Sequence, residues 1–346
     1  MPAQHRRRVF LAVFLTLFTG LACALLIERS GWAAAPSLAS AAGAARVVDA
    51  FEAVAGPQPG FRRNHAKGIC ISGRFDSNGR GAALARTALL RAGSYPVLGR
   101  FSVVGGNPSV NDTHGRMRSL ALDLRGGGET WRMALNSSPV FFVRTPEALL
   151  EQLQASAPTA ADSEARIQRF RRSHPEVQAF EEWMATHRPS SGFDNATYFS
   201  VNAFRFSDAA GREQWVRWRL QPETPYAPLS DEQVVQNDPD MLSYGVVSRL
   251  AQGPLRWHLI LTPALPGDPV NDATQLWTQP GHQEVDAGVL VIDAQQPQMD
   301  GPCRDIDFNP LMLPPGITPS DDPLLQARAA AYAESHRRRV REMTGQ

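Results

Sequence analysis

Short apolar stretches separated by turn-forming residues run from about residue 60 to residue 143, and the same texture returns after residue 198. Many of these stretches contain β-branched or aromatic side chains, which favour extended strands. The predicted strands cover residues 69–71, 97–104, 119–124, 131–135, 140–143, 198–206, 214–220, 255–261 and 289–292. This many short strands, with helical regions inserted between them, predicts an α+β fold in which helices pack outside an antiparallel β-barrel.

Helical patterns occupy the intervals between the strands. The predicted helices cover residues 45–54, 146–187 with a break at His174–Pro175, 230–251 in two parts around Pro239, and 322–343. Ser230 and Gln233 have the spacing of a capping box at the start of the third region. Residues 294–322 are rich in proline and glycine, and a stretch this long without regular structure usually has a positioning role.

The N-terminus has the layout of an export signal. Basic residues at positions 6–8 precede an apolar run from Val9 to Ile27, and small residues follow. The run is nearly long enough to span a bilayer, so residues 1–35 are predicted to be an export signal or a single-pass membrane anchor. We therefore expect a periplasmic protein, with a linker and short helix at 36–57 and one folded domain at 58–346.

Composition excludes some classes of function. The net charge of +1 gives no electrostatic argument for binding nucleic acid. The chain has three cysteines without a CxxC pair, so no zinc site is indicated. Cys70 and Cys303 could form a disulfide in an oxidising compartment, but their positions in the sequence leave this open.

The last predicted helix carries Arg328 and Tyr332, which are one helical turn apart and share a face. A guanidinium beside a phenol favours the phenolate form. Tyrosinate is one of the few side chains that serve as the fifth ligand of haem iron. This pair therefore indicates that the helix forms the proximal wall of a haem pocket.

Further motifs lie upstream in a fixed order. They are His65-Ala-Lys-Gly, Arg100-Phe-Ser102, Asn136-x-x-Pro-Val-Phe-Phe-x-Arg, Pro314-Pro-Gly-Ile and Leu325-Gln-x-Arg-x-x-x-Tyr332. Together they resemble the haem catalase superfamily over roughly residues 58–340. The resemblance implies a catalase-like barrel and a haem b cofactor.

The resemblance also implies a role for each matching residue. His65 would be the distal acid–base, Asn136 the distal hydrogen-bond donor and Ser102 the residue that orients the imidazole. Tyr332 would be the axial iron ligand. Arg62, Arg100 and Arg328 would correspond to arginines at the propionates and on the proximal side, and Phe141 to a packing residue of the distal pocket. One neutral histidine can take a proton from a peroxide and return it, and an amide can hold the peroxide without acting as a base.

The departures from large catalases suggest a smaller relative. Only 14 residues follow Tyr332, as in small catalase-related peroxidases. Less covering protein predicts that organic hydroperoxides and a small electron donor reach the haem, so that peroxidase turnover through a ferryl intermediate exceeds H₂O₂ dismutation. Asn64 precedes the histidine where large catalases usually have valine, and Leu149 replaces a phenylalanine that contacts the haem.

Two other functions stay open at this stage. A catalase-like hydroperoxide isomerase or lyase would use the same residues, and a non-enzymatic haem carrier of the envelope would need only the pocket. The basic run at 337–341 is interpreted as a solvated helix end that complements the helix dipole. His336, one turn after Tyr332, is interpreted as a surface or structural residue.

Overall fold

A computed structural model describes residues 37–158 and 162–345. Residues Leu38–Gln346 form one compact unit. The predicted export segment, including its apolar run, lies outside the described residues. Within the described part of the chain, no helix is both long enough and apolar enough to cross a bilayer.

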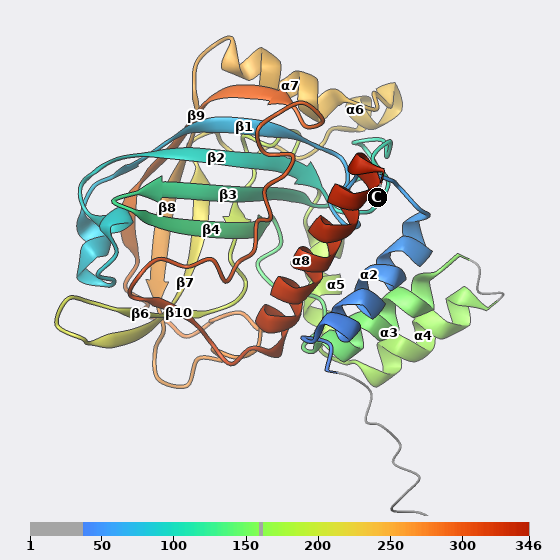
Figure 1. Ribbon diagram of the computed structural model, residues 1–346, viewed down its shortest axis with the longest axis horizontal. Coiled ribbons are helices and arrows are strands. Elements are labelled where there is room, and N and C mark those ends of the chain that lie inside the picture. The colour runs from blue at the N-terminus through green and yellow to red at the C-terminus, as the bar shows by residue number, and fades with distance from the viewer. Residues whose placement is uncertain (1–36, 159–161, 346) are drawn as a thin grey trace, which may run out of the picture. The chain divides into compact units, whose positions relative to one another are not determined.

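The core of the fold is a closed antiparallel barrel (Figure 1). Its ring has the order β7-β5-β4-β3-β2-β1-β9-β8, and the pairing of β8 with β7 closes it. The ring strands are β1 Gly68–Ser77, β2 Gly93–Val103, β3 Arg118–Gly126, β4 Glu129–Asn136, β5 Tyr198–Phe199, β7 Glu213–Pro222, β8 Leu255–Pro263 and β9 Val285–Pro297. Two short strands, β6 Phe204–Ser207 and β10 Ile317–Pro319, add to the edge beside β7. The predicted barrel is therefore confirmed.

Two strand predictions need correction. The stretch 198–206 is interrupted, because Val201 has a left-handed φ of 52° and separates β5 from β6. Residues 140–143 form no strand. There Pro139 has no N–H to donate, and the Ser138 hydroxyl donates to the Val140 carbonyl at 2.7 Å, which turns the chain toward the next helix.

Helices pack on the outside of the barrel, most of them at one end of the strands β1–β4 (Figure 1). They are α2 Ala41–Ala55, α3 Pro146–Ser156, α4 Ser163–Ser173, α5 Val177–Thr186, α6 Asp231–Gln236, α7 Met241–Leu250 and α8 Pro323–Thr344. The capping box of Ser230 and Gln233 is present, and the break at His174–Pro175 is confirmed. The helical region after residue 146 has one more break than predicted, before α4.

Helix α8 begins where the sequence indicates. The Asp322 carboxylate caps its first turn by accepting from the Leu324 N–H at 2.9 Å, and Pro323 fits the first turn because it lacks an N–H. In Figure 1, α8 runs beside α2 at one end of the strands β1–β4. Helix α2 also packs against α3 through an apolar cluster that includes Val47, Leu150 and Leu153.

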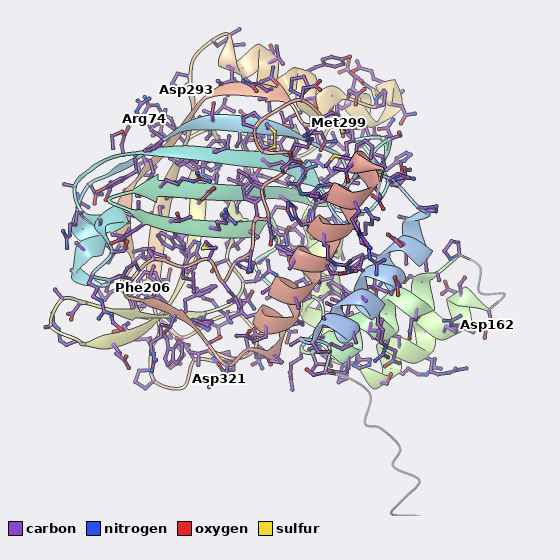
Figure 2. All side chains as sticks on the ribbon, in the orientation of Figure 1. Arg74, Asp162, Phe206, Asp293, Met299 and Asp321 are labelled. Carbon is purple, nitrogen blue, oxygen red and sulfur yellow. A yellow bond between two sulfur atoms is a disulfide. The ribbon has the colours of Figure 1, made fainter. Side chains whose placement is uncertain are left out.

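Cys70 and Cys303 form a disulfide with Cα atoms 5.4 Å apart, drawn as a yellow bond in Figure 2. It joins β1 to the segment that follows β9, across 233 residues of sequence. The pairing that the sequence left open is therefore present.

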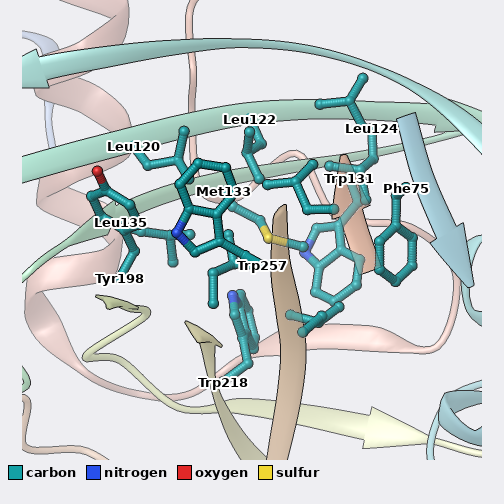
Figure 3. Close-up of a cluster of buried hydrophobic side chains, with 14 of the residues drawn as sticks. Phe75, Leu120, Leu122, Leu124, Trp131, Met133, Leu135, Tyr198, Trp218 and Trp257 are labelled. Carbon is teal, nitrogen blue, oxygen red and sulfur yellow. The ribbon is translucent and has the colours of Figure 1, made fainter. Parts of the chain in front are cut away.

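The barrel interior is filled with large apolar side chains (Figure 3). Trp131 meets Trp218 edge to face with ring centroids 5.1 Å apart. Elsewhere in the interior, Phe101 stacks on Phe193. Successive residues of a strand face opposite sides, so Phe101 and Leu120 point inward while Ser102 and Ser119 belong to the outer face. A binding site built from Ser102 and Ser119 must lie outside the barrel.

Candidate functional site

A cavity of about 450 Å³ lies outside the barrel between helices and strands. Helix α8, the strands β2–β4 and the helices α2 and α3 all contribute to its wall. The sequence-predicted site residues that line it are Arg62, His65, Arg100, Ser102, Asn136, Phe141, Arg328 and Tyr332. The structure therefore brings all eight residues to one place, although they span some 270 positions of sequence.

Arg328 and Tyr332 enter the cavity from α8. The Arg328 Nη2 atom lies 3.5 Å from the Tyr332 hydroxyl oxygen and 3.2 Å from the Ala134 carbonyl oxygen of β4. The guanidinium thus joins the helix to the barrel wall. This position fixes the arginine beside the phenol, as the sequence spacing predicted.

A chain of two hydrogen bonds fixes the orientation of the Arg328 guanidinium. Its Nη1 donates to the Asn202 side-chain oxygen at 2.6 Å, and the Asn202 amide donates to the Asp322 carboxylate at 2.8 Å. Both partners are 1% exposed. Burial raises the pKa of Asp322, while the hydrogen bonds from Leu324 and Asn202 act in the opposite direction. Neither Asn202 nor Asp322 was singled out from the sequence.

His65 stands in the turn before β1, with a left-handed φ of 57°. The Asn64 side chain supports this backbone, because its Oδ1 accepts from the N–H of His65 at 3.0 Å and from the N–H of Gly105 at 2.9 Å. The Ala66 N–H in turn donates to the Gly105 carbonyl at 2.8 Å. The side-chain oxygen of Asn64 therefore links the turn at His65 to the segment that follows β2.

The environment of His65 keeps its imidazole neutral. Burial, followed by the positive charges of Arg100, Arg328 and Arg62, lowers its pKa to about 3. Its Nδ1 is buried and has no hydrogen-bond partner among the described residues, so Nε2 is the ring nitrogen open to the cavity. Ser102 lines the same cavity, but no hydrogen bond to Nδ1 is formed.

Asn136 ends β4 opposite Ser119 of β3. The Ser119 hydroxyl donates to the Asn136 Oδ1 at 2.6 Å. This bond fixes the side-chain orientation and leaves the Asn136 amide nitrogen as a donor. Ser119 could not be assigned this role from sequence, because the contact depends on the register of β3 and β4.

A cluster of arginines gives one end of the cavity a high positive charge. Burial and the neighbouring Arg100 and Arg339 hold the pKa of Arg62 well below its ordinary range. Burial and Arg339 lower the pKa of Arg100 to about 9. Burial is also the largest influence that lowers the pKa of Arg339. Buried cations that repel one another in this way favour an anionic ligand between them.

Arg339 corrects the interpretation of the basic run as a solvated helix end. It is 3% exposed and lines the cavity, whereas Arg337 and Arg341 are exposed. Arg339 follows Tyr332 by about two helical turns and therefore lies on the same face of α8. That spacing could have identified it from the sequence. His336 also lines the cavity, with Nε2 at 2.8 Å from the Asp305 carbonyl oxygen.

The cavity fits haem in the type and location of its side chains. Arg100 Nε and Arg339 Nε and Nη2 are buried without hydrogen-bond partners among the described residues. Buried donors of this kind normally have an acceptor, and the carboxylates of a bound ligand would provide one. Tyr332 contributes a phenol to the same wall, and tyrosine is one of the few side chains able to bind haem iron. Apolar residues such as Phe141, Leu149 and Val140 line much of the remainder and suit a porphyrin ring.

Known proteins resemble this chain over most of its length. The sequence profile of the family described as Catalase matches residues 59–344. The chain is 32% identical to the catalase-related peroxidase of Synechococcus elongatus over 325 residues, which cover 93% of this chain and 96% of that protein. It is 28% identical to the catalase-related peroxidase of Mycolicibacterium paratuberculosis over 84% of this chain and 92% of that protein.

Solved structures give the same fold. A fungal catalase superimposes with a TM-score of 0.73 at 22% identity, over 81% of this chain and 59% of that chain. Catalase A from Saccharomyces cerevisiae gives a TM-score of 0.73 at 22% identity, over 81% and 61% of the two chains. The protein therefore spans about three fifths of these larger catalases.

The fold and the profile together define the class: the chain belongs to the catalase family. Within that family its length matches the relatives named catalase-related peroxidase. The protein is accordingly an oxidoreductase that acts on peroxide.

Proposed function

We propose that this protein is a haem peroxidase that reduces organic hydroperoxides at the expense of a small electron donor. The observation that carries the proposal is the meeting, in one cavity, of a neutral imidazole, a phenol beside a guanidinium, and buried arginines with unpaired nitrogens. In the balanced reaction, the peroxide O–O bond breaks with uptake of an electron pair and a pair of protons, giving an alcohol and water.

Haem, when bound, would supply the redox chemistry at its iron. Tyr332 would bind the iron as phenolate, with the charge of Arg328 beside it. Arg62, Arg100 and Arg339 would hold the haem carboxylates, because charge-assisted pairs suit buried guanidinium groups. Phe141 and Leu149 would pack against the ring system.

His65 would move the proton. Its neutral Nε2 can accept the proton of the first peroxide oxygen and return it to the leaving oxygen. Asn136 would donate its amide hydrogen to the peroxide, held in orientation by Ser119. Ser102 is proposed to orient the imidazole through Nδ1, the buried nitrogen that lacks a partner.

The chemistry of the cavity wall supports an organic peroxide. Helices α2, α3 and α5 contribute mostly apolar side chains, and an alkyl substituent would gain about 25 cal/mol per Å² of apolar surface buried against them. These residues are Val47, Phe51, Val54, Leu149, Leu153 and Phe180. A hydroperoxide with an alkyl or aryl group therefore fits the wall better than H₂O₂, which has nothing to bury.

We further propose that the protein works in the periplasm. The basic and apolar layout of residues 1–27 supports export, with the run at 9–27 as signal or anchor. The Cys70–Cys303 disulfide supports an oxidising compartment. Fractionation of expressing cells would place the protein with periplasmic or inner-membrane markers, and recovery with cytoplasmic markers would contradict the proposal.

Haem b is the proposed form of the cofactor. Covalent attachment through a C-x-x-C-H motif is impossible because the sequence contains no such motif. Extraction with acidified butanone should therefore release the haem into the organic phase.

Product analysis tests the proposed activity directly. The haem-loaded protein is incubated with cumene hydroperoxide, and separately with a fatty-acid hydroperoxide, with and without a phenolic donor. The proposal predicts the corresponding alcohol in proportion to donor oxidised, with slower turnover of H₂O₂ when no donor is present. Rearranged products formed equally well without donor would instead assign an isomerase or lyase, and no consumption of any peroxide would leave only haem binding.

A further inference from the structure

The segment between β9 and β10, residues 298–316, is here called the strap. The structure describes all of the strap, and no helix or strand forms in it. It nevertheless supplies Ile306, Asp307 and Phe308 to the wall of the cavity. Its conformation must therefore be fixed by contacts other than those of regular secondary structure.

The beginning of the strap holds Arg62 through backbone carbonyls. Arg62 Nη2 lies 3.0 Å from the Cys303 carbonyl oxygen, 3.3 Å from that of Arg304 and 3.0 Å from that of Ile306. We call these oxygens the carbonyl cradle. The Phe308 ring lies on the same guanidinium, with 5.8 Å from Arg62 Cζ to the ring centroid.

The carbonyl cradle determines where Arg62 can point. A buried guanidinium needs acceptors to offset the loss of water, and the strap backbone provides them. The Arg62 Nη2 atom is bonded to the cradle, and the guanidinium is planar. The position of the strap therefore sets the direction in which the other two nitrogens of Arg62 point. Arg62 stands three residues before His65, so it lies between the strap and the part of the cavity wall that carries His65.

The Cys70–Cys303 disulfide fixes the strap at the cradle itself. Cys303 contributes a carbonyl to the cradle and is bonded to Cys70 of β1, and both residues are fully buried. Gly301 allows this approach, because a Cβ atom there would lie 2.7 Å from the Cys70 Sγ. The later part of the strap has non-covalent support, such as the Arg132 side chain, which donates to the Asp307 carbonyl at 2.6 Å.

We propose that the Cys70–Cys303 disulfide is a positioning device for Arg62: it holds the carbonyl cradle so that this guanidinium stays directed at the haem carboxylate, and it thereby slows haem loss. The inference rests on the proposed function, since it takes haem as the ligand. Cys70 and Cys303 are positioning residues and touch no reacting atom. Loss of the bond frees the strap, and Arg62 then spends less time in the orientation that binds the carboxylate.

Haem transfer to excess apomyoglobin tests the proposal without any assay of activity. The haem-loaded full-length Cys70→Ala/Cys303→Ala variant should lose haem roughly tenfold faster than the wild type, the lower range for removing an outer-shell support. Gly301→Ala displaces the strap with both cysteines present and should also accelerate the loss. Ile71→Ala is the matched control, because this neighbour in β1 is buried in the barrel core instead of contacting the strap.

Combining the cysteine substitutions with Arg62→Ala shows whether the disulfide slows haem loss by positioning Arg62 or by stabilising the whole protein. In an Arg62→Ala background, the double cysteine substitution should add almost nothing to the rate of haem loss. Equal rates for the wild type and the double variant would overturn the proposal, as would an Ile71→Ala variant that loses haem as fast as the double variant. Independent effects of the cysteine and Arg62 substitutions would also overturn it. A wild-type protein that takes up no haem would instead refute the proposed function, and the inference with it.

Discussion

The guanidinium of Arg328 lies 3.5 Å from the phenol oxygen of Tyr332, one turn further along α8. Asn202 and Asp322 hold that guanidinium from the opposite direction through hydrogen bonds of 2.6 Å and 2.8 Å. The carboxylate that caps α8 is thus connected to the phenol through one amide and one arginine. The start of the helix and Tyr332 are therefore parts of a single hydrogen-bond network.

Asn202→Ala should disturb this network at its centre. The substitution leaves donor groups of Arg328 without an acceptor, which costs about 1–3 kcal/mol of unfolding free energy. The arginine also becomes free to move relative to Tyr332, so the haem absorption spectrum should change. Urea unfolding and absorption spectra measure the two effects.

Asn195→Ala is the matched control for that substitution. Asn195 is also buried and accepts from the Gly192 N–H, but its hydrogen bonds go to Gly192, Ser191 and Ala227 and none reaches α8. It should reduce stability by a similar amount and leave the haem spectrum unchanged. The same spectral change in both variants would show that the effect is not transmitted through Arg328.

Arg339→Ala should weaken haem retention. Its Nε and Nη2 have no partner among the described residues, and their loss removes a charge-assisted contact worth about 1.5–3 kcal/mol. Arg341→Ala removes an exposed cation two residues away and should have no effect. Haem transfer to apomyoglobin compares them, and equal rates for the two variants would contradict a carboxylate-binding role for Arg339.

Arg339 also shows what sequence could and could not reveal about the site. The motif residues His65, Asn136 and Tyr332 could be chosen because their spacing matches a known family. Arg339 belongs to a basic run, and the charge of that run suggested that its side chains are exposed to solvent. Only the helical spacing from Tyr332 indicated that Arg339 faces the cavity. Asn202 carried no signal in the sequence, since its role depends on the turn between β5 and β6, which brings it to Asp322 and Arg328.

Most elements of the fold, but not its tertiary details, could be predicted from the sequence. Apolar stretches with β-branched or aromatic residues, separated by turns, identified most of the ring strands, and the spacing of Ser230 and Gln233 identified the cap of α6. The break at Val201 was not foreseen, because a β-branched residue with positive φ contradicts local preference and is imposed by tertiary contacts. The Cys70–Cys303 bond stayed open for the same reason: it requires the geometry of β1 and the strap, which spacing in sequence does not contain.

His65→Ala should keep the haem but lose peroxide cleavage. General acid–base catalysis typically contributes about 10²–10⁴-fold, and the rate of the first reaction with peroxide should fall by that factor. Because the pKa of His65 is lowered to about 3, its basic form persists above that pH, and the wild-type rate should not decline between pH 8 and pH 5 through this residue. Stopped-flow absorption measures both results.

His114→Ala provides the control for His65, since this imidazole is exposed and outside the cavity. It should react with peroxide at the wild-type rate. An unchanged rate in His65→Ala would rule out the assigned proton transfer.

Lys67→Met should destabilise the loop after His65 in a pH-dependent way. Lys67 Nζ lies 3.0 Å from the Asp112 carboxylate, which is 2% exposed, and loss of a partner from a buried pair costs about 3–5 kcal/mol. Burial raises the pKa of Asp112, and Lys67 opposes that rise. Without Lys67, the folded state keeps the Asp112 proton at pH values where the unfolded chain has released it.

The sign of this effect follows from proton binding. The folded variant binds more protons than the unfolded chain above the unfolded carboxyl pKa of about 3.9, so its stability falls as pH rises through the raised pKa. The deficit should be smallest in acid and largest near neutrality in urea unfolding at a series of pH values. Asp240→Asn removes the more exposed partner of Lys67 and should cost only about 0–1 kcal/mol. A deficit for Lys67→Met that is independent of pH would contradict the argument.

The resonance Raman spectrum of the haem-loaded protein tests the central assignment most directly. With Tyr332 as the axial ligand, excitation into the charge-transfer band should enhance vibrations of an iron-bound phenolate, and Tyr332→Phe should abolish them while Tyr95→Phe, remote from the cavity, should not. A spectrum of histidine or thiolate ligation in the wild type, or phenolate bands that persist in Tyr332→Phe, would contradict the account.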